Sequence, residues 1–255
     1  MIAYQPNLPA QQCAKMIKNS RSLAVLSGAG ISTAAGIPDF RGPQGLYVTR
    51  RYDPEKVFEI SWFNRSPEYF YEFSSDFVNA AAQIKPTFSH NFLVSLENSG
   101  TLSGIVTQNI DLLHHLAGNQ SIIELHGSYN SATCTSCQAQ YQNLDYSWWQ
   151  TAMRDSTTPP ICHCPKCQGI LKPDIVFFGE MVDQFTPAEQ MIANCDMLLV
   201  LGSSLQVAPA SHLPYVTAAP TVVINQGDVM LEPAPNRYFV DADLDKYLLK
   251  VSKYL

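Results

Sequence analysis

The chain has 255 residues, of which 46% are hydrophobic and 15% are charged, so it can bury a large core and intrinsic disorder is not expected. Its net charge of -6 argues against broad nucleic-acid binding, which needs a basic surface that displaces counterions from phosphates. The first 19 residues lack a signal-peptide pattern, and no apolar run approaches membrane-spanning length. We therefore expect a cytoplasmic protein that associates with neither nucleic acid nor membrane, and whose seven cysteines are thiols or metal ligands.

Short apolar segments alternate with helical patterns along the chain, which predicts an α/β fold with a parallel sheet and crossover helices. Strands are expected at 23–26, 104–107, 121–125, 175–178, 197–201 and 221–224. Helical spacing is clearest at 10–17, 70–81 and 244–251. Thr186 to Glu189 has the pattern of a capping box, with Pro187 at the first helical position.

Two regions interrupt this alternation, the aromatic and proline-containing segment 47–85 and the cysteine-bearing segment 128–172. Both are predicted to be insertions into the α/β layer.

A glycine-rich turn follows the first expected strand. Gly28, Ala29 and Gly30 begin a run of small residues in which backbone N–H groups could approach a pyrophosphate, although the spacing departs from the usual dinucleotide motif and such turns also occur for purely conformational reasons. Beyond the turn, Phe40 could cover a flat ring and Arg41 could meet a phosphate. The alternative is a polar surface turn with one aromatic residue.

Polar side chains also end two further expected strands. Gln108, Asn109 and Asp111 follow 104–107, at the edge where open α/β sheets bind ligands, although Asp111 could simply cap the next helix. His126 ends the neighbouring strand and is followed by Gly127, so a titratable base is expected at the same edge. A purely structural histidine is the alternative.

Cysteines in two Cys-x-x-Cys pairs are spaced as ligands of one tetrahedral Zn²⁺. The expected ligands are Cys134, Cys137, Cys164 and Cys167, with Cys162 and His163 as possible substitutes. Four thiolates would complete the coordination shell, so a zinc ion there would be structural rather than catalytic. Cys13 and Cys195 lie in helical patterns and are interpreted as small core residues.

Taken in order, these motifs closely resemble those of the sirtuin family over about residues 20 to 245. They are the glycine turn with Pro38-Asp39-Phe40-Arg41, the run from Thr107 to Asp111, His126-Gly127, the two cysteine pairs, Phe177-Phe178-Gly179-Glu180 and Gly202-Ser203-Ser204-Leu205. The resemblance implies a Rossmann-like NAD-binding domain of residues 1–41, 86–127 and 173–255. Residues 42–85 would form a helical insertion and 128–172 a zinc-ribbon insertion, which together make a small domain.

The resemblance also implies an activity, the NAD-dependent removal of acyl groups from lysine side chains of proteins or peptides. In the family mechanism the acyl oxygen attacks the ribose carbon as nicotinamide leaves, which consumes NAD and yields O-acyl-ADP-ribose. His126 would be the general base and Asn109 a second catalytic residue. Protein ADP-ribosyl transfer or NAD hydrolysis in the same pocket remains the alternative function, and a noncatalytic zinc-ribbon interaction module is a further one.

Carried over position by position, the resemblance assigns residues to NAD and to the substrate peptide. The NAD residues would be Gly28, Ala29, Gly30, Thr33, Phe40, Arg41, Gln108, Asn109, Ile110, Asp111, Gly202, Ser203, Ser204, Asn225, Gln226 and Asp243. The peptide would pair with two strand-like segments through Val176, Phe177, Phe178, Gly179, Glu180, Leu205 and Val207. Relatives that prefer acidic acyl groups carry a Tyr-x-x-Arg pair, and the segment from Tyr69 to Ser74 lacks that arginine and includes Glu72. Neutral acyl groups such as acetyl are therefore expected.

Overall fold

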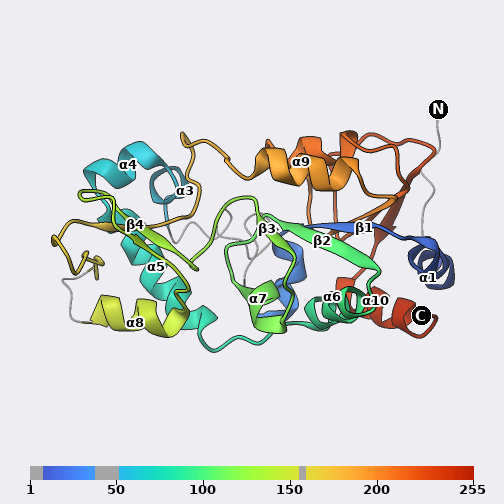
Figure 1. Cartoon of the computed structure of the whole chain (residues 1–255), viewed down its shortest axis with the longest axis horizontal. Coiled ribbons are helices and arrows are strands. Elements are labelled where there is room, and N and C mark those ends of the chain that lie inside the picture. The colour runs from blue at the N-terminus through green and yellow to red at the C-terminus, as the bar shows by residue number, and fades with distance from the viewer. Residues whose placement is uncertain (1–7, 38–51, 155–158) are drawn as a thin grey trace.

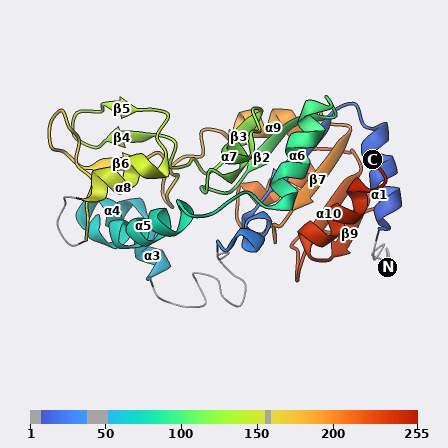
Figure 2. The same ribbon diagram turned by 90° about the horizontal axis from the view of Figure 1, so that it is seen from below.

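The computed structural model describes residues 8–37, 52–154 and 159–255 and shows two parts side by side (Figures 1 and 2). One part contains a six-stranded parallel sheet and the other a small antiparallel sheet with its own helices. Within these ranges no helix has the length and apolar character needed to cross a membrane.

The large sheet has the strand order β3-β2-β1-β7-β8-β9, and every pair in it is parallel. Its strands are β1 (Leu23–Ser27), β2 (Leu102–Thr107), β3 (Ile122–Glu124), β7 (Met197–Leu201), β8 (Thr221–Asn225) and β9 (Arg237–Asp241). The expected α/β class and five of the six expected strands are confirmed. Because parallel strands share an orientation, the polar residues that follow β1, β2, β3, β7 and β8 gather at one edge.

Helices cover both faces of this sheet, which explains why β1 and β7 are buried along their whole length. Val25 and Leu199 belong to one core cluster, together with helices α1 (Ala10–Asn19), α6 (Phe88–Asn98) and α10 (Leu244–Ser252). Ala24 and Leu198 face the other way and pack with α9 (Phe185–Ala193) and η3 (Ala210–Tyr215). The short helix α7 (Leu113–Ala117) follows β2.

The small sheet consists of β5 (Gln140–Tyr141), β4 (Ala132–Cys134) and β6 (Leu171–Pro173), in that antiparallel order. Around it lie α3 (Pro54–Val57), α4 (Ile60–Arg65), α5 (Glu68–Ala81) and α8 (Tyr146–Arg154), and Figure 2 shows α5 and α8 beneath the strands. The core here is aromatic, and Trp149 and Tyr129 are fully buried with their rings edge to face. Residues from both expected insertions thus share one core.

Two predictions of local structure were wrong, and one strand was missed. Segment 175–178 is not a strand of the sheet, because the N–H groups of Val176 and Phe178 bond instead to His126 O and Phe58 O. Thr186 does not cap α9, which begins after Gln184 without a side-chain cap. The edge strand β9 was not predicted, since its charged ends Arg237 and Asp241 hide the short apolar run between them.

Candidate active site

The glycine turn after β1 forms two short 3-10 turns, η1 (Ala29–Ile31) and η2 (Thr33–Ala35). It packs tightly on the turn after β7. Gly30 N donates to Gly202 O at 2.8 Å, and a Cβ on Gly30 would lie 2.7 Å from Gly202 Cα. Gly28 N likewise donates to Leu201 O at 3.0 Å. The two glycines are therefore required by the contact between loops, and their N–H groups are already used inside the protein.

The polar cluster expected after β2 is present and buried. Asn109 and Asp111 are 8% and 4% exposed, and the Asn109 amide donates to Asp111 Oδ2 at 3.2 Å. Ser32, from the glycine turn, donates to the same carboxylate oxygen at 2.5 Å and accepts from Asn109 Nδ2 at 3.2 Å. Gln108 turns the other way and donates to Ser203 Oγ at 3.0 Å. The cluster thus connects the ends of β1, β2 and β7.

Asp111 contacts the start of α7 and also belongs to the polar cluster. Its Oδ1 accepts from Leu113 N at 3.0 Å at the start of α7, while Oδ2 faces Ser32 and Asn109. Burial raises the pKa of this carboxyl, and the hydrogen bonds it accepts oppose that shift. A helix-capping contact and a place in the polar cluster are therefore compatible.

His126 lies two residues beyond β3, half-buried and beside the cluster. Its Nδ1 is 3.0 Å from Gln108 O, and because a carbonyl can only accept, Nδ1 carries the proton in the neutral ring. Nε2 then holds a lone pair. Burial lowers the pKa of His126, with the bond to Gln108 acting in the opposite direction, so the ring is held in the form that accepts a proton.

Gly127 permits the sharp turn after this histidine. Its φ is +65°, and a Cβ at this position would lie 1.8 Å from Asp174 O. The turn brings the chain past residues 174–176, and Val176 N donates to His126 O at 2.8 Å.

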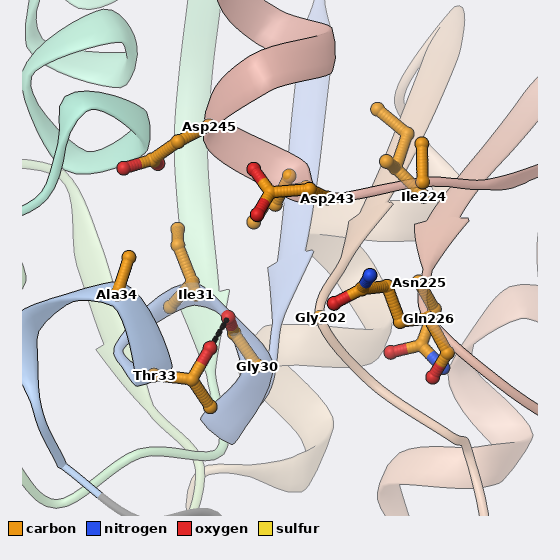
Figure 3. A pocket seen from close by; sticks show the side chains of 12 residues that line it. Gly30, Ile31, Thr33, Ala34, Gly202, Ile224, Asn225, Gln226, Asp243 and Asp245 are labelled. Carbon is orange, nitrogen blue, oxygen red and sulfur yellow. Dashed lines mark hydrogen bonds between the residues drawn. The ribbon is translucent and has the colours of Figure 1, made fainter.

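A pocket of about 530 Å³, including the part open to solvent, lies where the glycine turn meets the ends of β7 and β8 and the start of α10 (Figure 3). The expected residues that line it are Gly30, Thr33, Gly202, Asn225, Gln226 and Asp243. Asp243 also caps α10, because its carboxylate accepts from Lys246 N at 2.9 Å. The residues on the pocket wall that were not expected are Ile31, Ala34, Ile224, Ala242, Leu244 and Asp245.

The two segments expected to hold a peptide are loops rather than strands. Phe177 and Leu205 are each 1% exposed and belong to core clusters, whereas Phe178 is 54% exposed. The N–H groups of Val176, Phe177, Phe178 and Glu180 bond within the protein. Any backbone pairing with a peptide must therefore use other groups of these segments, such as their carbonyls.

The four cysteines of the two knuckles come together. Their sulfur atoms lie within 4.8 Å of one another, with Cys134 and Cys167 at 3.5 Å and Cys137 and Cys164 at 3.8 Å. Four sulfurs about 2.3 Å from a central ion would be about 3.8 Å apart, whereas a disulfide needs about 2.0 Å. A hydrogen bond from the Tyr141 hydroxyl lowers the pKa of Cys164, and backbone N–H groups lower that of Cys134. The cluster fits a tetrahedral metal ion.

Neither candidate substitute belongs to this cluster. Cys162 is fully buried in the aromatic core, and the Nδ1 of His163 lies 3.0 Å from Gln168 O. Cys13 and Cys195 are buried as expected, but only Cys13 lies in a helix, because α9 ends at Ala193. Phe40 and Arg41 lie outside the described residues.

A family model described as "Sir2 family" matches residues 28–209, more than half of the chain. The chain belongs to the Sir2 family. It is 41% identical over 219 residues to NAD-dependent protein deacetylase 1 of Pyrobaculum aerophilum, covering 84% of this chain and 82% of that one. It is 37% identical to NAD-dependent protein deacylase 2 of Archaeoglobus fulgidus, covering 88% and 87%.

Solved Sir2 structures have the same fold. One with a deacetylated p53 peptide and 3′-O-acetyl ADP-ribose has a TM-score of 0.86 at 32% identity, covering 96% of this chain and 98% of that one. Another with a p53 peptide and NAD⁺ has a TM-score of 0.84 at 32% identity, with the same coverage.

Sequence reasoning about this Sir2 chain missed two polar side chains next to the expected site. Ser32 stands in the glycine turn, where its small size suggested only a tight bend, and its bond to Asp111 spans 79 positions. Lys172 precedes the proline of β6, and its ammonium contacts Ile175 O and Glu180. The only signal that the sequence offered for Ser32 was its place inside the glycine turn, and for Lys172 it offered none.

Proposed function

We propose that this chain is an NAD-dependent protein deacylase that transfers acyl groups, acetyl in particular, from lysine side chains to ADP-ribose and releases nicotinamide. The curated relatives are named as deacetylases and deacylases. The solved Sir2 structures hold a deacetylated p53 peptide with 3′-O-acetyl ADP-ribose, a p53 peptide with NAD⁺, and an acetylated peptide. Identity above 30% over most of each chain supports carrying this activity over.

The observation that carries the proposal is the geometry of His126. A base for a ribose hydroxyl must be neutral, oriented and next to the sugar. The Gln108 carbonyl holds Nδ1–H, burial disfavours the charged ring, and Nε2 is left as the proton acceptor. We assign His126 as the general base and Asn109 as its catalytic neighbour.

NAD is assigned across the edge of the large sheet. Its adenosine end would occupy the pocket bounded by Asn225, Gln226 and Asp243. Its nicotinamide end would lie at the cluster of Asn109, Ile110 and Asp111, with Asp111 on the carboxamide. Gln108 would contact the ribose between them, because its side chain already reaches Ser203 at the boundary of the two regions.

The four-cysteine cluster is assigned to one structural Zn²⁺. The donor set is all sulfur and the spacing fits tetrahedral coordination, both of which suit zinc. A zinc ion there would crosslink β4, the turn after it and the loop before β6. The residues of the cluster take no part in the proposed proton transfer.

We further propose that the chain divides into a NAD-binding domain of residues 1–41, 86–127 and 173–255 and a small domain built from 42–85 and 128–172. The acyl peptide would lie between them, along segments 176–180 and 205–207. Glu72 of α5 is exposed and carries a negative charge, which would repel an acidic acyl group. The Tyr71 hydroxyl already donates a hydrogen bond to Leu171 O, so it is not available to bind an acyl carboxylate.

Incubation of the protein with acetylated, propionylated and succinylated lysine peptides, with and without NAD, tests the proposal by mass spectrometry of the products. We expect loss of the neutral acyl groups only when NAD is present, together with stoichiometric nicotinamide and O-acyl-ADP-ribose. NAD loss that does not depend on an acylated peptide would instead indicate NAD hydrolysis. An increase in peptide mass by one ADP-ribose would indicate ADP-ribosyl transfer.

A further inference from the structure

Lys172 lies where the small sheet leads into the loop beside His126. Its backbone is part of β6 and stands opposite Thr133 of β4, while the preceding Leu171 stands opposite Cys134. The side chain is 13% exposed. The position of its Cα is therefore set by the strand pairing next to the cysteine cluster.

The ammonium group of Lys172 points into the loop that follows. Nζ donates to Ile175 O at 2.7 Å and to Glu180 Oε2 at 2.9 Å, and it lies 3.5 Å from Pro173 O. It also lies 4.2 Å from the centre of the Phe177 ring, within the range of a cation–π contact. An ammonium has three N–H donors, and this one directs them at a single stretch of eight residues.

Glu180 closes the loop from the other end. The same Oε2 that accepts from Lys172 accepts from Phe177 N at 2.7 Å. The loop from Pro173 to Glu180 thus surrounds one cation with two of its carbonyls, one carboxylate and one aromatic ring. These are charge-assisted contacts, which are stronger than neutral hydrogen bonds.

The curled loop also sets the surroundings of the proposed base. Val176 N donates to His126 O at 2.8 Å, and Phe178 exchanges backbone bonds with Phe58 and Ile60. A single side chain therefore joins the small sheet, the backbone beside His126 and the segment assigned to the peptide.

A surface ion pair of the same region shows how different this arrangement is. Lys56 Nζ and Asp53 Oδ2 are 3.3 Å apart, but the two side chains are 32% and 47% exposed, and the residues lie only three positions apart, at the start of α3. Such exposed pairs contribute little to stability. Lys172 differs because it is mostly buried and contacts main-chain carbonyls as well as a carboxylate.

We propose that Lys172 is a positioning residue for the acyl-lysine peptide, which it serves by holding residues 173–180 in the shape that receives the substrate backbone. The inference rests on the proposed deacylase function. Without the ammonium, Ile175 O and the Glu180 carboxylate lose their donor and the loop can open. None of these groups lines the pocket assigned to adenosine. The effect is therefore selective for the peptide over NAD.

The test compares Lys172→Met, Lys172→Arg and the matched control Lys56→Met in steady-state assays that vary the acetylated peptide and NAD separately. Methionine keeps most of the aliphatic stem and removes the charge, and arginine restores it. We expect Lys172→Met to raise the KM for peptide by about tenfold or more, the equivalent of one lost charge-assisted hydrogen bond. Its KM for NAD should change by less than about twofold. Arginine should recover most of the loss, and Lys56→Met should match the wild type.

Unchanged peptide KM in folded Lys172→Met would overturn the proposal, as would equal rises in both KM values or the same effect from Lys56→Met. Should Lys172→Met fail to fold, Glu180→Gln, which keeps an acceptor for Phe177 N, must show a smaller rise confined to the peptide. Fluorescence anisotropy of a labelled acetylated peptide measures binding without turnover. This binding measurement tests the role of Lys172 even if the wild type shows no NAD-dependent deacylation. That absence of activity would contradict the proposed function but not the role of Lys172 in peptide binding.

Discussion

The two sheets of this protein are stabilised in different ways. The six-stranded sheet is covered on both faces, and β1 and β7 are buried at every position, so burial of apolar surface can hold it together. The small sheet has strands of three, two and three residues, too short to persist alone, and it depends both on the aromatic core packed against it and on the four cysteines at one side. The catalytic residues are assigned to the large region and the metal crosslink to the small one. Replacement of a catalytic residue and removal of the metal should therefore affect the two regions differently.

Replacement of the base should give the largest effect on activity and none on either sheet. We expect His126→Ala to lower kcat for deacylation by about 100-fold to 10,000-fold, the usual contribution of a general base. The side chain is only half-buried, and among the described residues it makes one hydrogen bond, to Gln108 O, so thermal unfolding should stay close to that of the wild type. Near-normal turnover by this variant would contradict the assignment.

Removal of the metal should separate the two regions. All three tryptophans, Trp62, Trp148 and Trp149, lie in the small region, so their fluorescence reports on it alone. On chelation we expect an altered tryptophan spectrum and amide exchange faster by about a hundredfold or more at the small sheet, since a structural metal contributes folding free energy directly.

Amides of β1 and β7 should keep their protection in that experiment. Cys137→Ser should reproduce the effect of the chelator, and Cys195→Ser, a buried cysteine of the large region, should leave the small sheet unaffected. Equal loss of protection in both sheets would show that they unfold as one unit.

The sequence was informative where a local pattern suffices. Apolar runs identified the central strands, and the rule that parallel strands end at one edge predicted that His126 lies beside the residues that follow β2. The His126 ring does reach Gln108 O, although the Gln108 side chain turns away from Asp111. Spacing identified the cysteine cluster. The apolar pattern was misleading for segment 175–178, whose residues form a loop around Lys172. A buried loop and a buried strand can have the same apolar composition. Ser32 and Lys172 could not be found this way, since their contacts depend on tertiary structure.

A buried histidine pair gives the large region a pH dependence of its own. His90 and His114 have ring centres 4.8 Å apart and are 0% and 2% exposed. Burial lowers the pKa of His90 to about 4 and, together with the neighbouring ring, that of His114 to about 3. Below about 6.5 the unfolded chain therefore binds protons that the folded chain does not, and stability must fall as the pH drops from there toward 4.

We expect the free energy of unfolding to fall by a few kcal/mol, as an order of magnitude, over that window. Urea unfolding at several pH values, followed by far-UV circular dichroism, measures it. In the His90→Gln variant the free energy of unfolding should depend less steeply on pH, because one of the two titrating groups is gone. Release of a metal from the cysteines by acid would affect both proteins equally. Identical slopes would exclude the pair as the source.

The smallest expected effect distinguishes a structural role of Asp243 from its proposed role at NAD. The carboxylate caps α10, and replacement of such a cap by alanine costs about 1 kcal/mol. Asparagine caps about as well as aspartate but carries no charge. We therefore expect Asp243→Ala to lower the free energy of unfolding by that amount, while Asp243→Asn leaves it unchanged. If the carboxylate also binds the adenosine ribose, both variants should raise the KM for NAD severalfold. An unchanged KM for NAD in both variants would show that Asp243 is only a helix cap. The ribose contact would then be assigned to Asn225 or Gln226, which line the same pocket.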